Sequence, residues 1–232
     1  MPFGDLSCLM TVTHELKAPL ALVRQLSLEL ESTILDEQER MRLIRQITLT
    51  TERALRLTAD LTRSARLEDS LFDLEPLNVQ QICEEAAHEL SPLYVAHGRE
   101  IRVVARQHAN LVIANKDLLR RVLLNFGDNA LHYGESEKPV ELKVKSSRND
   151  EMVRIGVRDY GPAVSINAWQ AMQDRLGRSG QLLNARPQSS GVGLLIAGQF
   201  ALAMNGRIGA TRHRDGATFY VDLNASTQMS LL

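Results

Sequence analysis

The chain has 232 residues, which is enough for one or two domains of ordinary size. Its 27 lysine and arginine residues balance 28 aspartate and glutamate residues, and the net charge of -1 argues against a strongly basic nucleic-acid-binding protein or an acidic tail. With 44% hydrophobic and 24% charged residues, the composition is that of a globular protein. The two cysteines, Cys8 and Cys83, lie far apart, so neither a disulfide scaffold nor a cysteine zinc site is expected.

The first third of the chain is typical of long helices. Between Leu6 and Leu67 there is no glycine and a single proline, Pro19. Two interleaved sets of mostly apolar residues repeat every seven positions, as in a coiled coil or a helical bundle. The first set is Leu9, Leu16, Val23 and Leu30, and the second is Thr13, Leu20, Ser27 and Ile34.

A second helix is predicted to begin at Asp36-x-x-Glu39, which matches a capping box. Its seam runs from Ile44 to Ala65. Two long helices joined by a short turn form an antiparallel hairpin with one apolar stripe on each helix. Two copies side by side would bury all four stripes in a four-helix bundle, so we predict a homodimer through residues 6–68. The alternative is that the hairpin packs on the remainder of its own chain.

After the hairpin the pattern changes to that of a mixed α/β domain. Helices are expected to pack on one face of a mixed sheet, which gives an α+β fold with domains at 1–70 and 71–232. The sheet should close with a hairpin around Asp215-Gly216, and Asp117 should cap the central helix. Strands are predicted at 72–77, 101–106, 111–114, 140–145, 152–158, 207–212 and 217–223, and helices at 79–90, 117–132 and 191–204.

The first candidate site is the segment His14-Glu15-Leu16-Lys17-Ala18-Pro19-Leu20. His14 lies beside the predicted seam, so its ring should face solvent on the flank of the bundle. An exposed imidazole has a pKa of about 6.5, and its neutral form is a nucleophile. Glu15 can orient the ring or accept its proton, and Pro19 bends the helix. A lone histidine on a helix is more often an ordinary surface residue, and these neighbours favour a function.

The second candidate site is a pair of amides on the central helix. Asn125 and Asn129 are four residues apart and therefore share one helix face. Because asparagine is a poor helix former, two on one face indicate a polar role, such as holding a hydrated Mg²⁺ or a phosphate. Exposed or capping amides are the alternative interpretation.

Two glycine-containing segments complete the set. Asp159-Tyr160-Gly161-Pro162-Ala163 follows a strand, and its carboxylate can accept a hydrogen bond from a ligand amine, although the same residues are typical of a plain β-turn. Gly191-Val192-Gly193-Leu194 opens an apolar helix, where backbone N–H groups can approach a phosphate. The spacing matches neither a Walker A loop nor a Rossmann fingerprint.

Taken in order, these four segments resemble the H box, the N box and the two glycine boxes of bacterial sensor histidine kinases of two-component systems. The resemblance covers nearly the whole chain. It implies that residues 1–70 are a dimerisation and histidine-phosphotransfer domain and that 71–232 are an ATP-binding domain of the Bergerat (GHKL) type, shared with gyrase and Hsp90. It further implies that His14 attacks the γ-phosphate of ATP with the help of Glu15, and that the phosphoryl group then passes to an aspartate of a response regulator receiver domain.

The resemblance also implies the cofactors and their contacts. ATP and Mg²⁺ are the expected cofactors, with Asn129 as the metal ligand and Asn125 in support. Asp159 would receive the adenine amino group, and the backbone of Gly191 and Gly193 would contact phosphates. The other implied ATP-binding residues are His132, Tyr133, Gly161 and Leu194. The expected location is the cytoplasm, on its own or as the cytoplasmic part of a membrane-bound sensor; no membrane segment lies in this chain, and nucleic acid is not an expected partner.

The chain departs from the family pattern at several positions. Ala18 stands where the family usually has Thr or Asn four residues after the histidine, which predicts weak phosphatase activity towards the regulator. His132 replaces a frequent Lys, Ala163 replaces the second glycine of the first glycine box, and no Phe-rich segment is visible in 166–180. These changes keep open a dimeric histidine-phosphotransfer or adaptor protein whose degenerate C-terminal domain does not bind ATP. A non-kinase ATPase of the same fold would leave His14 unexplained.

Overall fold

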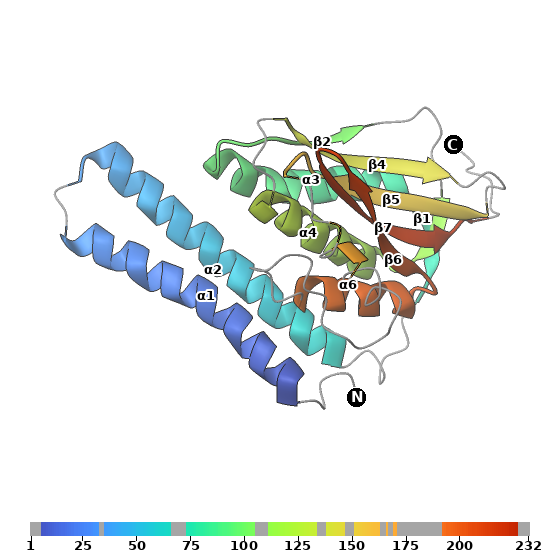
Figure 1. Cartoon of the computed structure of the whole chain (residues 1–232), viewed down its shortest axis with the longest axis horizontal. Coiled ribbons are helices and arrows are strands. Elements are labelled where there is room, and N and C mark those ends of the chain that lie inside the picture. The colour runs from blue at the N-terminus through green and yellow to red at the C-terminus, as the bar shows by residue number, and fades with distance from the viewer. Residues whose placement is uncertain are drawn as a thin grey trace. The chain divides into compact units, whose positions relative to one another are not determined.

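A computed structural model describes residues 6–32, 35–65, 73–104, 111–133, 138–146, 151–162, 166, 169–170 and 192–226. The chain divides into two compact units, residues 1–68 and 69–232 (Figure 1). The first unit is helical, and the second combines a mixed sheet with helices. The α+β class predicted from the sequence is therefore confirmed.

The first unit is a helical hairpin made of α1 (Leu6–Ser32) and α2 (Glu37–Ala65). The predicted capping box is present. The backbone N–H of Glu39 donates to Asp36 Oδ1 at 2.7 Å, and the backbone N–H of Asp36 donates to Glu39 Oε2 at 3.3 Å. These two bonds satisfy N–H groups that have no partner inside the helix, so they define where α2 begins.

The apolar seam of the hairpin is only partly covered within the chain. Leu26 and Leu43 are buried, and each is next in sequence to a predicted seam residue. The seam residues Leu20 and Ile44 are exposed. Exposed apolar side chains on these two helices are Leu20, Leu22, Leu28, Met41, Ile44 and Leu55. The hairpin therefore keeps an uncovered apolar surface, as expected for two helices that make a single line of contact.

The second unit contains a five-stranded sheet with strand order β2-β4-β5-β7-β6. The pair β2–β4 is parallel and the other pairs are antiparallel. A separate antiparallel pair is formed by β1 (Glu75–Asn78) and β3 (Leu111–Ala114). The strands of the large sheet are β2 (Ile101–Val104), β4 (Val140–Ser146), β5 (Met152–Arg158), β6 (Arg207–His213) and β7 (Gly216–Asn224).

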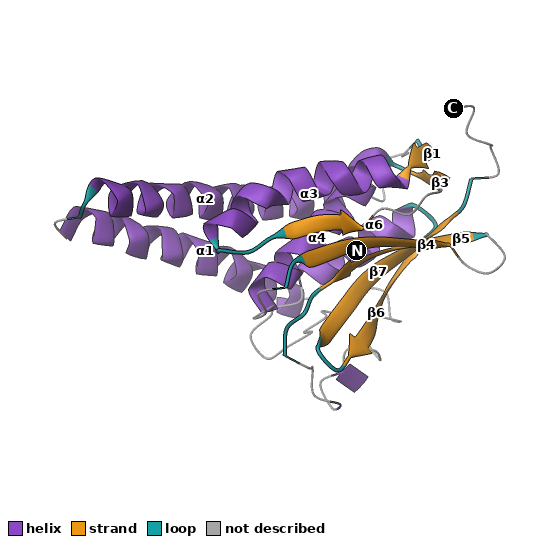
Figure 2. Cartoon of the chain, turned by 90° about the horizontal axis from the view of Figure 1, so that it is seen from above, coloured by secondary structure: helices purple, strands orange, loops and turns teal. Residues whose placement is uncertain are grey.

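Three helices cover one face of this sheet: α3 (Val79–Ala96), α4 (Lys116–Tyr133) and α6 (Val192–Ala203) (Figure 2). The central helix α4 contacts α3 on one side and α6 on the other. Side chains alternate along β5, so Val153, Ile155 and Val157 are buried in the core while Arg154 and Arg158 point to the opposite face. The sheet therefore has one apolar face under the helices and one polar outer face.

Two helix ends differ from the sequence expectation. Helix α3 continues to Ala96 rather than ending near Leu90, because Leu93 and Tyr94 are buried and stabilise its last turns. The cap of α4 is Asn115 instead of Asp117: Asn115 Oδ1 accepts from the backbone N–H of Leu118 at 3.1 Å. Asp117 lies in the first turn, where its negative charge interacts favourably with the helix dipole.

Candidate functional site

The topology brings three of the four sequence motifs to one end of the sheet. Strand β5 ends at Arg158, which pairs with Glu141 near the start of β4 and with Thr218 near the start of β7. Helix α4 precedes β4, so its C-terminal half lies at this end. Helix α6 runs towards the start of β6, and β6 then runs back to end beside the start of β7. The first turn of α6 therefore lies at this same end of the sheet.

Asp159 is the first residue after β5, and it is only 2% exposed. Its backbone N–H donates to the carbonyl oxygen of Ala217 at 3.0 Å, which extends the pairing with β7 by one residue. Its side-chain Oδ1 accepts from the backbone N–H of Gly161 at 3.2 Å and from that of Ala217 at 3.3 Å. The bond from Gly161 closes a local side-chain-to-backbone ring of the Asx type, and together the bonds hold a buried carboxylate in place.

The tip of the β6–β7 hairpin packs directly on this carboxylate. Gly216 has φ of 122°, a backbone conformation that L side chains rarely adopt. A Cβ atom at this position would also collide with the backbone oxygen of Asp159 and lie 2.7 Å from its Oδ1. Only glycine therefore fits at position 216, where the start of β7 lies against Asp159.

Helix α4 carries the two asparagines of the N box. A Cβ atom on Gly193, in the first turn of α6, would lie 3.4 Å from Asn125 Oδ1, so the N box and the second glycine box are adjacent. The side-chain Nδ2 of Asn129 is buried and makes no hydrogen bond within the described part of the chain. An unsatisfied buried amide costs about 1–3 kcal/mol, so its presence favours a polar ligand at this position.

A close approach of α3 fixes the middle of α4. The hydroxyl of Tyr94 donates to the carbonyl oxygen of Gly127 at 2.8 Å, and a Cβ atom on Gly127 would collide with Leu90. Burial raises the pKa of Tyr94, the charge of Arg99 opposes this shift, and the negative charges of Asp128 and Asp159 add to it. The phenol therefore stays protonated and acts as the hydrogen-bond donor to Gly127.

Sequence reasoning missed Tyr94. The signal that could have found its contact is Gly127, because a glycine inside an amphipathic helix often marks a close approach of another element. On the other side of α4, the rings of Phe126 and Phe219 lie 6.2 Å apart and join the helix to β7.

The structure describes the other predicted site residues only in part. Gly161 and Leu194 are buried, and the backbones of His132 and Tyr133 form the last turn of α4. The side chains of those two residues, like the side chains of His14 and Glu15 in α1, lie outside the described residues, and so does the whole of Gly191 and of Ala163. Residues 171–180, in which a Phe-rich segment was sought, are likewise outside them.

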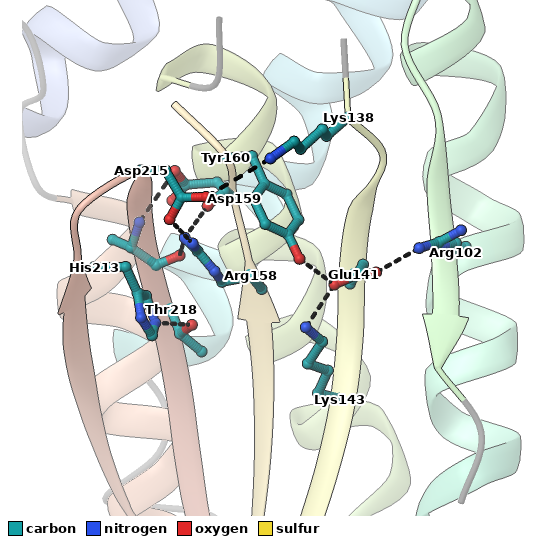
Figure 3. A network of polar contacts seen from close by, with 11 residues as sticks. Arg102, Lys138, Glu141, Lys143, Arg158, Asp159, Tyr160, His213, Asp215 and Thr218 are labelled. Carbon is teal, nitrogen blue, oxygen red and sulfur yellow. Dashed lines mark hydrogen bonds and ion pairs between the residues drawn. The ribbon is translucent and has the colours of Figure 1, made fainter. Parts of the chain in front are cut away.

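The outer face of the sheet near Asp159 carries a network of polar contacts (Figure 3). Buried Glu141 accepts from Arg102 Nη2 at 2.6 Å and from the hydroxyl of Tyr160 at 2.6 Å, and it pairs with Lys143. Burial alone would raise the pKa of Glu141, but these three donors outweigh it and hold that pKa at about 2. The network therefore contains an ionised carboxylate at every pH near neutrality.

Comparisons with known proteins identify the family of the chain. Residues 114–227 match the family described as histidine kinase-, DNA gyrase B-, and HSP90-like ATPase. The chain is 32% identical over 130 residues to the sensor histidine kinase component HK1 of Mycobacterium tuberculosis, which covers 56% of this chain and 73% of that protein. It is 28% identical over 208 residues to the sensor protein kinase PmrB of Pseudomonas aeruginosa, covering 88% of this chain and 42% of that protein.

Among solved structures, full-length ShkA in complex with AMPPNP is similar with a TM-score of 0.63 and 26% sequence identity, covering 97% of this chain and 47% of that chain. The chain therefore belongs to the bacterial sensor histidine kinases, and its second unit belongs to the ATPase family that they share with DNA gyrase B and HSP90. The resemblance found from the four boxes is confirmed. The chain spans 24–42% of the length of three curated relatives that it matches over most of its own length.

Two further observations limit the kinds of site present. None of the helices in the described ranges has both the length and the apolar character needed to cross a membrane. Among the residues that the structure describes, no three His, Cys, Asp or Glu side chains are grouped so that they could hold a metal ion.

Proposed function

We propose that this chain is an ATP-dependent protein histidine kinase, which phosphorylates its own His14 and passes the phosphoryl group to an aspartate of a response regulator. The observation that carries the proposal is the contact between Gly193 and Asn125, one helix turn from the buried and unsatisfied amide of Asn129. The buried carboxylate of Asp159, at the end of β5, supports it. The similar protein ShkA has been solved in complex with AMPPNP, which supports a nucleotide as the ligand.

In this proposal, Asp159 recognises the base. A carboxylate is an acceptor only, so it selects a ligand that presents an amine, such as adenine. Its hydrogen bonds to the backbone N–H groups of Gly161 and Ala217 hold it in a fixed orientation. A pre-oriented acceptor loses little entropy when the base binds.

The phosphates bind at the start of α6. The first turn of α6 carries no acidic residue, so nothing on it opposes the positive end of the helix dipole. Gly193, and Gly191 before it in the sequence, lack a Cβ and let phosphate oxygens approach the backbone N–H groups. Asn125, which lies beside Gly193, supports the same region.

The amides of α4 fit a hydrated Mg²⁺ that is bound mainly through phosphate oxygens. Asn129 would hold the metal through its side-chain oxygen, with Asn125 in support, because Mg²⁺ prefers oxygen ligands and takes few from protein. When bound, Mg²⁺ neutralises negative charge on the phosphates. The absence of a carboxylate cluster in the described residues fits this mode, in which ligand oxygens supply most of the coordination.

The chemical step moves the terminal phosphoryl group onto α1. The neutral imidazole of His14 attacks the γ-phosphorus, an N–P bond forms, and the bond between that phosphorus and the bridging oxygen breaks to release ADP. Glu15 orients the ring or takes the proton that the imidazole loses. Attack by a receiver-domain aspartate then breaks the N–P bond and regenerates His14.

The uncovered apolar surface of the hairpin supports a homodimer through residues 6–68. Leu20 and Ile44 belong to the predicted seams, and both are exposed in the single chain. A second copy would bury these stripes in a four-helix bundle. Apolar burial stabilises by roughly 25 cal/mol per Å² of covered surface, so several leucines per helix can hold such a dimer together.

Incubation with γ-labelled ATP and Mg²⁺ tests the proposal. The wild-type chain should become labelled, His14→Ala should not, and His88→Ala should be labelled like the wild type because that residue lies exposed on α3. A wild-type chain that stays unlabelled while binding no nucleotide at millimolar ATP would support the adaptor protein instead. A labelled His14→Ala variant would show that the phosphoryl group goes to another residue.

A further inference from the structure

Arg158 is a buried charged residue next to the base-recognising carboxylate, and the proposed chemistry does not use it. Its side chain points to the outer face of the sheet, and the residue is 7% exposed. Moving a guanidinium out of water is costly unless its N–H groups find partners. The partners of Arg158 therefore show what this charge holds in place.

Each partner of Arg158 belongs to the frame around Asp159. Its Nη1 donates to the carbonyl oxygen of Asp159 itself, and lies 3.4 Å from the carbonyl oxygen of Ala217. Its Nη2 donates to the carboxylate of Asp215, in the turn before Gly216. One guanidinium thus joins the end of β5 to the hairpin tip that packs against Asp159 (Figure 3).

A second set of contacts in the network holds Tyr160, the residue after Asp159. The guanidinium of Arg158 lies over the ring of Tyr160, 4.3 Å from its centroid, and the hydroxyl of Tyr160 donates to Glu141 Oε2 at 2.6 Å. Because Tyr160 lies between Asp159 and Gly161, holding this ring also holds the backbone N–H that binds Asp159 Oδ1. The carboxylate is therefore positioned from both sides.

We infer that Arg158 and Asp215 form a clasp that positions the carboxylate of Asp159 and thereby sets the preference of the site for a 6-amino purine over a 6-oxo purine. This inference rests on the proposed function, since it assigns Asp159 to the base. An amine at position 6 donates to the carboxylate, whereas an oxygen at that position repels it. The preference depends on distance and angle, so it weakens when the clasp is removed.

A matched pair of arginines makes the inference testable. Arg154 lies on the same strand and the same face as Arg158, donates to Asp222 at 2.7 and 2.9 Å, and lies over the ring of Tyr220. It also pairs with an aspartate and a tyrosine ring, but it lies two pleat repeats, or four residues, before Arg158 on β5. Arg154→Gln therefore removes an arginine–aspartate ion pair from the same face of the sheet without touching the clasp.

The experiment titrates the full chain with ATP and with ITP in the presence of Mg²⁺, and compares the two affinities. In the wild type ATP should bind more tightly than ITP, and Asp159→Asn should remove this preference. Arg158→Gln should lower the ATP-to-ITP ratio by about tenfold, by weakening ATP while ITP changes by less than about twofold. Arg154→Gln should leave the ratio at the wild-type value.

Asp215→Asn keeps the test decisive if Arg158→Gln does not fold, because Asp215 is largely exposed and the asparagine oxygen can still accept a hydrogen bond from the buried Arg158. It should lower the same ratio, by less than Arg158→Gln does. A parallel loss of ATP and ITP affinity in the Arg158 or Asp215 variant, or an unchanged ratio, would overturn the clasp. So would an equal fall of the ratio in Arg154→Gln.

Failure of the proposed function and failure of the clasp would appear in different samples. If the wild-type chain binds ATP and ITP equally, or binds neither, the assignment of Asp159 to the base is wrong and the clasp falls with it. If the wild type discriminates and the variants discriminate equally well, only the clasp is wrong. The wild-type titration therefore tests the proposed function, and the variants test the further inference.

Discussion

The hydroxyl of Tyr94 donates to the carbonyl oxygen of Gly127, 2.8 Å away, in the middle of the helix that carries Asn125 and Asn129. Both residues are buried, so no water replaces this bond in the folded chain. The contact joins α3 to the N box without touching the residues that would bind a ligand. A change to this hydrogen bond should therefore alter the stability of the protein without altering the residues that would bind a ligand.

Tyr94→Phe removes this bond and leaves the ring in place. We expect a loss of about 1 kcal/mol in the free energy of unfolding, since the Gly127 carbonyl keeps its place in the helix but loses its second donor. Denaturant unfolding with an unchanged m-value would measure it. Equal stability of the two proteins would show that the hydroxyl contributes nothing to the packing of α3 on α4.

Two glycine-to-alanine changes should act in opposite ways. Alanine is favoured over glycine inside a helix by about 1 kcal/mol. At Gly127 the new methyl group meets Leu90, which is buried and cannot move freely, so overpacking should exceed this gain and lower the stability by about 1 kcal/mol. At Gly193 the methyl group has ordinary contact distance to Asn125 Oδ1, and the stability should stay equal or rise.

The two variants should differ in the opposite way in their affinity for ATP. Gly193→Ala adds a Cβ where phosphate oxygens approach the backbone, so ATP affinity should fall severalfold in a protein that is as stable as the wild type. Gly127→Ala should lose stability and keep most of its ATP affinity at a temperature where it is folded. Thermal unfolding and isothermal titration measure the two quantities, and unchanged affinity in Gly193→Ala would remove this glycine from the proposed site.

The sequence predicted the local elements of the protein better than the contacts between residues that are far apart in the chain. The capping box at Asp36 and the alternation along β5 each depend on neighbouring residues of one segment, and both are found in the structure. The predicted heptad seams are not the buried line of the hairpin, since Leu20 and Ile44 are exposed and Leu26 and Leu43 are buried instead. The clasp joins Arg158 to Asp215, which lies far along the chain, and its geometry depends on strand register. No local pattern encodes that register, so the clasp became visible only in the folded chain.

The same limit explains the helix ends. The end of α3 depends on the burial of Tyr94 against α4, which is a tertiary contact. Asn115 and Asp117 are both good caps by residue type, and only the backbone geometry selects Asn115. The sequence therefore predicts that a capping residue stands near the start of α4, whereas the folded structure decides which of two suitable residues it is.

Glu141 should make the stability of the second unit depend on acid pH. Its pKa is about 2 in the folded chain against an ordinary value of 4.5, because Arg102, Lys143 and Tyr160 stabilise the ionised form more than burial opposes it. A lowered pKa gives stability that is fully present above about pH 4.5 and is lost as the pH falls towards 2. The loss should be about 2–3 kcal/mol across this window.

Denaturant midpoints measured between pH 6 and pH 2 would follow this change. Glu141→Gln should be less stable than the wild type at pH 6 and should show a flatter profile, so the two curves converge at low pH. Glu151→Gln is the matched control, because that carboxylate lies exposed just before β5 and should leave the profile unchanged. A Glu141→Gln profile as steep as the wild type would assign the acid sensitivity to other groups.

Ala18 should limit the removal of phosphate from the phosphorylated response regulator. It is exposed on α1, four residues after His14, and its methyl group cannot hydrogen-bond a water molecule. The wild-type chain should therefore dephosphorylate its regulator slowly. Ala18→Thr supplies a hydroxyl at this position and should raise the rate by about tenfold or more, since a positioned polar group orients the attacking water.

Ala21→Thr makes the same substitution at an exposed position further along α1, and it carries the same cost in helix propensity. It should leave dephosphorylation at the wild-type rate. Release of phosphate from the purified phosphorylated regulator, with labelling of His14 measured in the same samples, separates the two activities. Fast dephosphorylation by the wild type, unaltered in Ala18→Thr, would mean that the water is oriented by a group on the regulator or elsewhere on the kinase.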